Sequence, residues 1–105
     1  MHGDGCQITE FVSTLNDRTS NRLFAIIKKT ADEGKYEEEE IYRHIGEGIW
    51  EFKAQTARIY SFCDGARRIV LSHAGYKPNK NMVKPERDKA KAIRDQYEQW
   101  KRTAS

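Results

Sequence analysis

The sequence predicts an α+β fold, in which an N-terminal helical hairpin packs on a small antiparallel sheet that a C-terminal helix follows. Apolar residues recur with helical spacing in residues 8–34 and again after Pro85, whereas three short segments in residues 49–73 alternate as strands do. These segments lie close together in the chain, so an antiparallel meander is the simplest sheet. We expect helices on one face of it and the other face partly free. With 105 residues, 1–105 should be a single domain.

The helical hairpin is predicted from two apolar stripes separated by a polar break. Asp17 is a suitable N-cap for the second helix, and Gly34 is a suitable stop. The spacing i, i+3, i+4, i+7 marks the first stripe, Ile8, Phe11, Val12 and Leu15, and the second contains Leu23, Phe24, Ile27 and Ala31. The run Glu37–Glu40 that follows is best interpreted as a solvated turn or helix start rather than a metal site.

The sheet is predicted as Ile49–Lys53, Arg58–Cys63 and Arg68–His73. A glycine-bearing turn at 46–48 precedes the first strand, and Asp64–Gly65 is a hairpin signal between the second and the third. Alternation places Glu51 with Lys53 on one face of the first strand, opposite Trp50 and Phe52. In the third strand it places His73 with Ile69 and Leu71, which favours a packed histidine.

The C-terminal segment is predicted to be a basic loop and a helix. Gly75–Lys84 is rich in Lys and Asn and is interrupted by Pro78, and Pro85 suits the first turn of a helix. The apolar face of that helix contains Ala90, Ile93, Tyr97 and Trp100, with Lys and Arg on its other sides.

Charge divides the chain into two halves. Residues 52–105 contain 13 Lys and Arg against 5 Asp and Glu, whereas residues 1–51 contain 6 against 11. A basic surface on a small sheet suits a polyanion, and nucleic acid is the commonest one in cells. The sequence has no CxxC, no paired-His spacing and no Gly-rich phosphate loop, so neither a metal nor a nucleotide cofactor is expected. No apolar run could cross a bilayer, and residues 1–7 do not resemble a secretory signal, so we expect a cytoplasmic protein with free thiols.

Residues 8–100 resemble the HigB/RelE-like toxins of bacterial toxin–antitoxin pairs, and most closely their phage-derived Gp49-like branch. The resemblance rests on an ordered series of short motifs: Glu10–Leu15, Gly48-Ile49-Trp50-Glu51-Phe52-Lys53, Arg58-Ile59-Tyr60, Gly65, Ile69-Val70-Leu71-Ser72-His73, Lys77, Lys80, Pro85-Glu86 and Ala90. The chain departs from the pattern in three places. Residues 1–7 are a poor match to the usual opening strand, Lys53 stands where Arg is more usual, and Pro78 interrupts a run that is commonly consecutive lysines.

The resemblance implies a small RelE-like ribonuclease that cuts mRNA in the ribosomal decoding site without a metal. It also implies a cognate antitoxin, of the helix-turn-helix kind, that blocks the toxin and through which the complex binds operator DNA. Cleavage without a metal uses the neighbouring 2′-hydroxyl as nucleophile. The protein must remove that proton, stabilise the charge on the phosphorane and protonate the leaving oxygen.

Candidate catalytic residues follow from that chemistry. Arg58 matches the family's phosphate-facing arginine and would stabilise charge, with Lys53 beside it as a phosphate contact or base. Lys77 would clamp the phosphate or bind ribosomal RNA. Glu51 would orient Lys53 or Arg58, with a general-base role as the less favoured alternative, and His73 could serve as acid or base. The remaining candidates would contact RNA: Lys80, Arg68, Lys84 and Arg67. For each of them a solvated or structural role is the alternative.

Two other functions fit the same residues. A non-catalytic module could hold RNA, or hold DNA together with a helix-turn-helix partner, without cutting it. A protein-interaction subunit would show no salt-dependent RNA binding.

Overall fold

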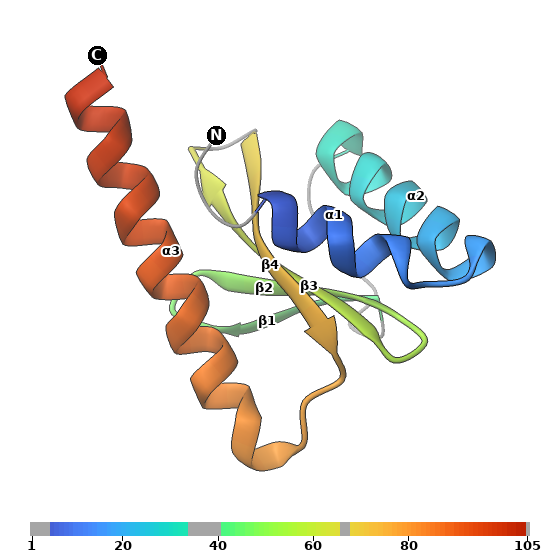
Figure 1. The fold of residues 1–105 in the computed structure, drawn as a ribbon. Helices are drawn as coiled ribbons and strands as arrows, with labels where there is room; N and C mark the ends of the chain where they lie inside the picture. The colour runs from blue at the N-terminus through green and yellow to red at the C-terminus, as the bar shows by residue number, and fades with distance from the viewer. Residues whose placement is uncertain (1–4, 34–40, 66–67, 105) are drawn as a thin grey trace.

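The structure, a computed structural model, describes residues 5–33, 41–65 and 68–104. Its elements, in chain order, are α1 (Gly5–Ser13), α2 (Asp17–Glu33), β1 (Tyr42–Gly46), β2 (Ile49–Ala54), β3 (Ala57–Asp64), β4 (Arg68–Tyr76), the 3-10 turn η1 (Lys80–Met82) and α3 (Val83–Ala104). The strands form one antiparallel sheet in the order β1-β2-β3-β4 (Figure 1). The predicted α+β class is confirmed.

The sheet is covered on both faces, and the expectation of a partly free face is wrong. On one face, α1 and α2 pack against Phe52, Ile59 and Ala74. On the other, Ala90 and Tyr97 of α3 pack against Tyr60 and Phe62, and α3 crosses the sheet there (Figure 1). Strand β3 has apolar side chains on both faces of the sheet, with Ile59 on one and Tyr60 and Phe62 on the other. Both faces must therefore be covered by helices to keep these side chains from water.

Helix α2 differs in detail from its predicted pattern. The buried face of the helix contains Leu23 and Ile26. Phe24 and Ala31, which were predicted for that face, are exposed, Phe24 by 54%. The N-cap is one residue earlier than predicted, because the side chain of Asn16 accepts the backbone N–H of Thr19 at 2.8 Å. The predicted stop at Gly34 and the acidic run Glu37–Glu40 lie outside the described residues.

Strand β1 was not predicted from the sequence. It pairs antiparallel with β2, and its Tyr42 ring stacks on Trp50 and Phe52 at centroid distances of 4.7 and 4.5 Å. His44 is exposed on this strand, and its Nε2 accepts the backbone N–H of Gly48. The sheet thus has four strands where three were predicted.

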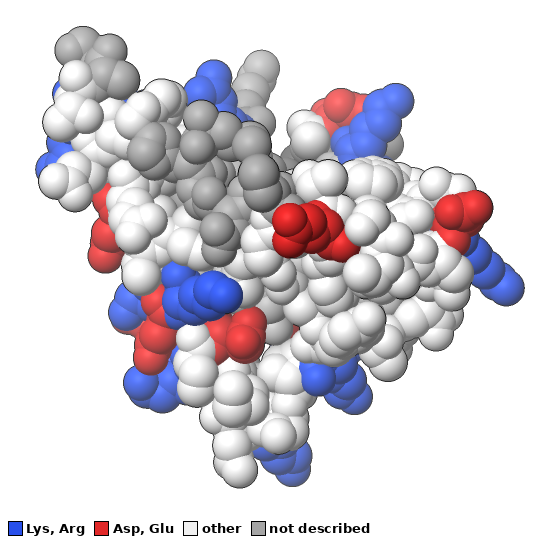
Figure 2. Space-filling view, in the orientation of Figure 1, with Lys and Arg blue, Asp and Glu red and all other residues white. Residues whose placement is uncertain are grey.

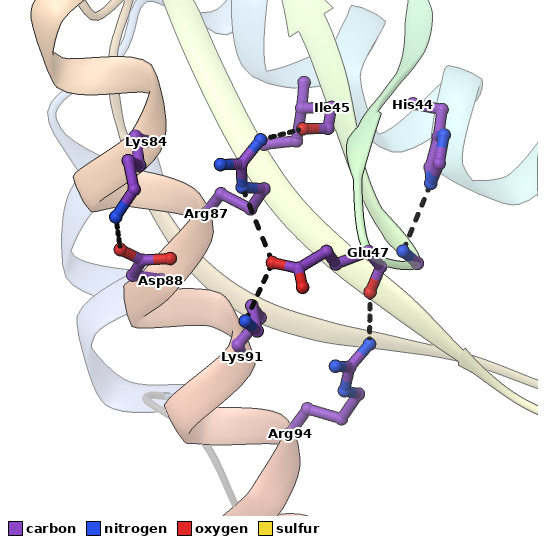
Figure 3. Close-up of polar contacts among 9 residues, drawn as sticks. His44, Ile45, Glu47, Lys84, Arg87, Asp88, Lys91 and Arg94 are labelled. Atoms are coloured by element: carbon purple, nitrogen blue, oxygen red, sulfur yellow. Dashed lines mark hydrogen bonds and ion pairs between the residues drawn. The ribbon is translucent and has the colours of Figure 1, made fainter.

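Two hairpin turns bind α3 to the sheet. In the β1–β2 turn, the carboxylate of Glu47 lies 2.7 Å from Lys91 Nζ, and its backbone carbonyl accepts a bond from Arg94 (Figure 3). In the β3–β4 turn, the carboxylate of Asp64 accepts hydrogen bonds from Lys101 and Tyr97, both at 2.6 Å. Basic and acidic side chains lie next to one another along α3 (Figure 2). Several Lys and Arg side chains of residues 52–105 therefore form ion pairs with carboxylates of the same chain.

Candidate functional site

A cationic cleft of about 490 Å³ opens where the start of α2 lies beside the ends of β2 and β3. Lys53 comes from β2 and Arg58 from β3, and their Cα atoms are partners in the sheet. Arg18 and Arg22 come from the first two turns of α2 and are exposed. The lining residues are Arg18, Thr19, Arg22, Ile41, Lys53, Ala54, Gln55 and Arg58, and we call this space the cationic cleft. Four positive side chains in one concave space form a site for an anion.

Arg58 is a fixed cation in this cleft. Its residue is only 7% exposed, and Nη1 donates hydrogen bonds to the carbonyls of Gln55 and Ala57, both at 2.8 Å. Burial lowers the pKa of the guanidinium below its usual value, and the nearby Glu51 carboxylate acts in the opposite direction. An arginine remains protonated under these conditions. Because its orientation is set before a ligand arrives, it can stabilise negative charge at little cost in reorganisation.

Glu51 lies behind the cleft between two arginines. It is 1% exposed, with Oε2 3.8 Å from Arg58 Nε and Oε1 3.3 Å from Arg43 Nη2. The carboxylate does not line the cleft. Its geometry suits the orienting part of its predicted role, that of a buried counter-ion for Arg58.

His73 lies in the core on the α3 side of the sheet. Its Nδ1 is 2.9 Å from Ser72 Oγ, its Nε2 is 2.8 Å from Glu86 Oε2, and its ring stacks on Tyr60 at 4.6 Å. The prediction that His73 shares a face with Ile69 and Leu71 is wrong. The pairing of β3 with β4 shifts between Tyr60 and Ser61, which turns His73 to the opposite face. Its catalytic role stays a prediction.

Of the predicted basic residues of the loop, Lys77 lies nearest to the cleft in the described structure. The backbone N–H of Lys77 donates to the carbonyl of Thr56 at 2.6 Å, which brings the exposed Lys77 next to the β2–β3 turn. Lys80 is exposed in η1, and Lys84 pairs with Asp88 at 2.9 Å within α3.

Arg68 lies at the opposite end of the sheet from the cleft. It is the partner of Asp64, six positions along β3 from Arg58, or about 20 Å at the usual rise of a strand. Arg67 lies outside the described residues. The structure therefore brings together Lys53, Arg58 and Lys77 and separates Arg68 from them.

Arg18 and Arg22 line the cleft but were not predicted from the sequence as site residues. They are four positions apart and so share one face of α2. That spacing was visible in the sequence, but the acidic balance of the first half obscured it.

Across the described ranges, 5–33, 41–65 and 68–104, no three His, Cys, Asp or Glu side chains gather in a way that could hold a metal ion. Within the same ranges, no helix has both the length and the apolar character to cross a membrane.

Comparison with known protein families places most of the chain in one of them. Residues 10–95 match the family described as "Phage derived protein Gp49-like". The matched segment begins in α1, ends in α3 and contains every described residue that lines the cationic cleft. No curated protein and no solved structure matches the chain.

Proposed function

The chain belongs to the Gp49-like family, a family of RelE/HigB-like toxins, and from this premise we propose that it is a metal-independent endoribonuclease that cleaves mRNA as the toxin of a toxin–antitoxin pair. The observation that supports this best is the cationic cleft, in which the buried Arg58 stands beside Lys53 and two further arginines. A phosphodiester gains negative charge as it is cleaved, and fixed cations stabilise that state more than the ground state.

In the proposed reaction, the 2′-hydroxyl of one nucleotide attacks the adjacent phosphorus and the bond from phosphorus to the 5′-oxygen breaks. The 2′-proton passes to a base, the 5′-oxygen takes up a proton, and the products are a 2′,3′-cyclic phosphate and a 5′-hydroxyl. Arg58 stabilises the phosphorane, and Lys53 contacts the phosphate or accepts the proton. Lys77, beside the β2–β3 turn, clamps the RNA from the outer side.

The proposed partners follow from the same family membership. mRNA on the ribosome is the substrate, and a helix-turn-helix antitoxin inhibits the protein and links it to operator DNA. The proposed setting is the cytoplasm.

A non-catalytic RNA-binding module is the second candidate, and one observation favours it. The predicted acid–base groups Glu51 and His73 are each 1% exposed and do not line the cleft. In this case the cleft would hold RNA without cutting it.

The distinguishing experiment adds purified protein to a translation extract and maps mRNA ends by primer extension. We expect the wild type to cut and Arg58→Ala to cut about 10²–10³-fold more slowly, the usual effect of removing a charge-stabilising donor. Arg58→Lys tests whether charge without the guanidinium fork suffices, and Lys28→Ala, an exposed change outside the cleft, serves as control. Equal cutting by Arg58→Ala would refute the site, and a wild type that binds RNA without cutting would favour the second candidate.

A further inference from the structure

We propose that Arg18 and Arg22 of α2 bind the backbone phosphates of single-stranded RNA next to the scissile phosphate. The inference rests on the proposed function, since that supplies RNA as the ligand. It gives α2 a part in substrate binding, whereas the RNA contacts predicted from the sequence all lie in residues 51–84.

The first support is position. Arg18 and Arg22 are one helical turn apart, about 6 Å along the axis of α2, and both line the cleft that contains Lys53 and Arg58. An RNA chain whose scissile phosphate contacts Arg58 would therefore pass Arg18 and Arg22 within the cationic cleft. Guanidinium groups suit this position because their planar fork can hold two phosphate oxygens at once.

The second support is that these charges are available. Arg43, Arg87 and Lys91 form ion pairs with carboxylates of the chain. Among the residues that the structure describes, neither Arg18 nor Arg22 forms an ion pair or a side-chain hydrogen bond, and both are exposed. Within the described ranges, no carboxylate therefore neutralises their charge, and both guanidinium groups are exposed to a ligand.

The composition of the cleft also indicates which part of the RNA it holds. The described residues that line it include four cations and no aromatic side chain, whereas proteins that hold single-stranded bases stack them on aromatic side chains. Phosphate contacts set the position of a nucleic acid without reading its sequence. The α2 arginines should therefore bind RNA of any sequence.

The test measures binding of a fluorescent, fully 2′-O-methylated single-stranded RNA 12-mer, which lacks the attacking 2′-hydroxyl, by anisotropy over a range of salt concentrations. Arg18→Ala/Arg22→Ala should bind roughly tenfold more weakly for each arginine removed, the loss of one charge-assisted hydrogen bond each. The plot of log K against log salt should become shallower by about 1.4, since each single-strand phosphate contact contributes about 0.7. Lys28→Ala/Lys89→Ala removes the same charge at exposed positions outside the cleft and should keep the wild-type slope.

The outcomes separate this proposal from the proposed function. If the wild type cleaves mRNA but Arg18→Ala/Arg22→Ala binds the 12-mer with wild-type affinity and slope, the α2 arginines are not phosphate contacts. If the wild type does not cleave mRNA, yet its binding of the 12-mer still depends on both arginines, the α2 phosphate contacts are supported and the proposed nuclease activity is refuted. If the double variant loses affinity for a poly-glutamate peptide but not for RNA, the cleft serves an acidic protein partner and our proposal is overturned. Thermal melts would verify that each variant is folded.

Discussion

Replacing Glu51 by Gln should destabilise the protein, because it leaves Arg58 buried without its carboxylate. The distance of 3.8 Å between Glu51 Oε2 and Arg58 Nε corresponds to about 4 kcal/mol of attraction at an effective dielectric constant of 20. The Arg43 side chain on the other oxygen is 43% exposed, so water screens that pair to about 0.2–1 kcal/mol. The desolvation cost of the Glu51 carboxylate, which the substitution removes, offsets part of this attraction.

The net loss should lie below the usual range for a broken buried pair, about 3–5 kcal/mol. Arg58 keeps its two carbonyl acceptors and Arg43 can be hydrated again, so we expect about 2–3 kcal/mol for Glu51→Gln. In a chain of this size, such a loss lowers Tm by roughly 10–20 °C.

Urea and thermal unfolding, followed by circular dichroism, would measure the loss. Glu98→Gln makes the same charge change at an exposed site on α3 and should stay within about 0.5 kcal/mol of the wild type. Arg43→Ala should cost less than about 1 kcal/mol, as expected for a half-exposed partner. If Glu51→Gln unfolds like Glu98→Gln, the carboxylate does not compensate Arg58, and its orienting role is refuted.

Two further predictions concern the contacts that bind α3 to the turns. Gly46→Ala should cost about 0.5–1.5 kcal/mol more than Gly65→Ala, the usual worth of one hydrogen bond. Both glycines have positive φ, and a Cβ at Gly65 has no neighbour within 4 Å. A Cβ at Gly46 would lie 2.9 Å from Arg87 Nη1 and would displace it from the carbonyl of Ile45. Equal losses in urea unfolding would contradict that close contact. The hydrogen bond from Lys101 holds the pKa of Asp64 below its usual value, so Asp64→Asn should be less stable than the wild type above about pH 4, and the difference should fade at lower pH as Asp64 is protonated. A difference that does not shrink as the pH falls below about 4 would rule out this linkage.

The local patterns predicted most of the secondary structure. The alternation of residues along β2 and β3 showed which side chains share a face of the sheet. The Asp64–Gly65 signal correctly located the hairpin between β3 and β4. Strand β1 was missed because Arg43 and His44 interrupt its short apolar pattern, and only pairing with β2 shows that Tyr42 belongs to the core. The register shift beside Ser61 has no local signal, so the face of His73 could not be predicted.

The arrangement in space was less accessible from the sequence. Periodicity identifies the apolar face of α3, including Ala90 and Tyr97, but it does not say which side of the sheet that face covers. Lys53 and Arg58 are neighbours in one hairpin, so their pairing could be predicted. Arg18 and Arg22 reach the same cleft only through the packing of α2 on the sheet, which is a tertiary relation.

The position of α3 after all four strands has a consequence for synthesis. A chain emerging from the ribosome folds from its N-terminal side, so the face of the sheet that contains Tyr60 and Phe62 is made before the helix that covers it. A nascent chain that stops before α3 would expose this apolar face and would be open to chaperones and proteases. The described residues that line the cationic cleft fall within 18–58 and therefore precede α3. For a protein proposed to act on ribosomes, the RNA-facing residues would be synthesised before the segment that secures the fold.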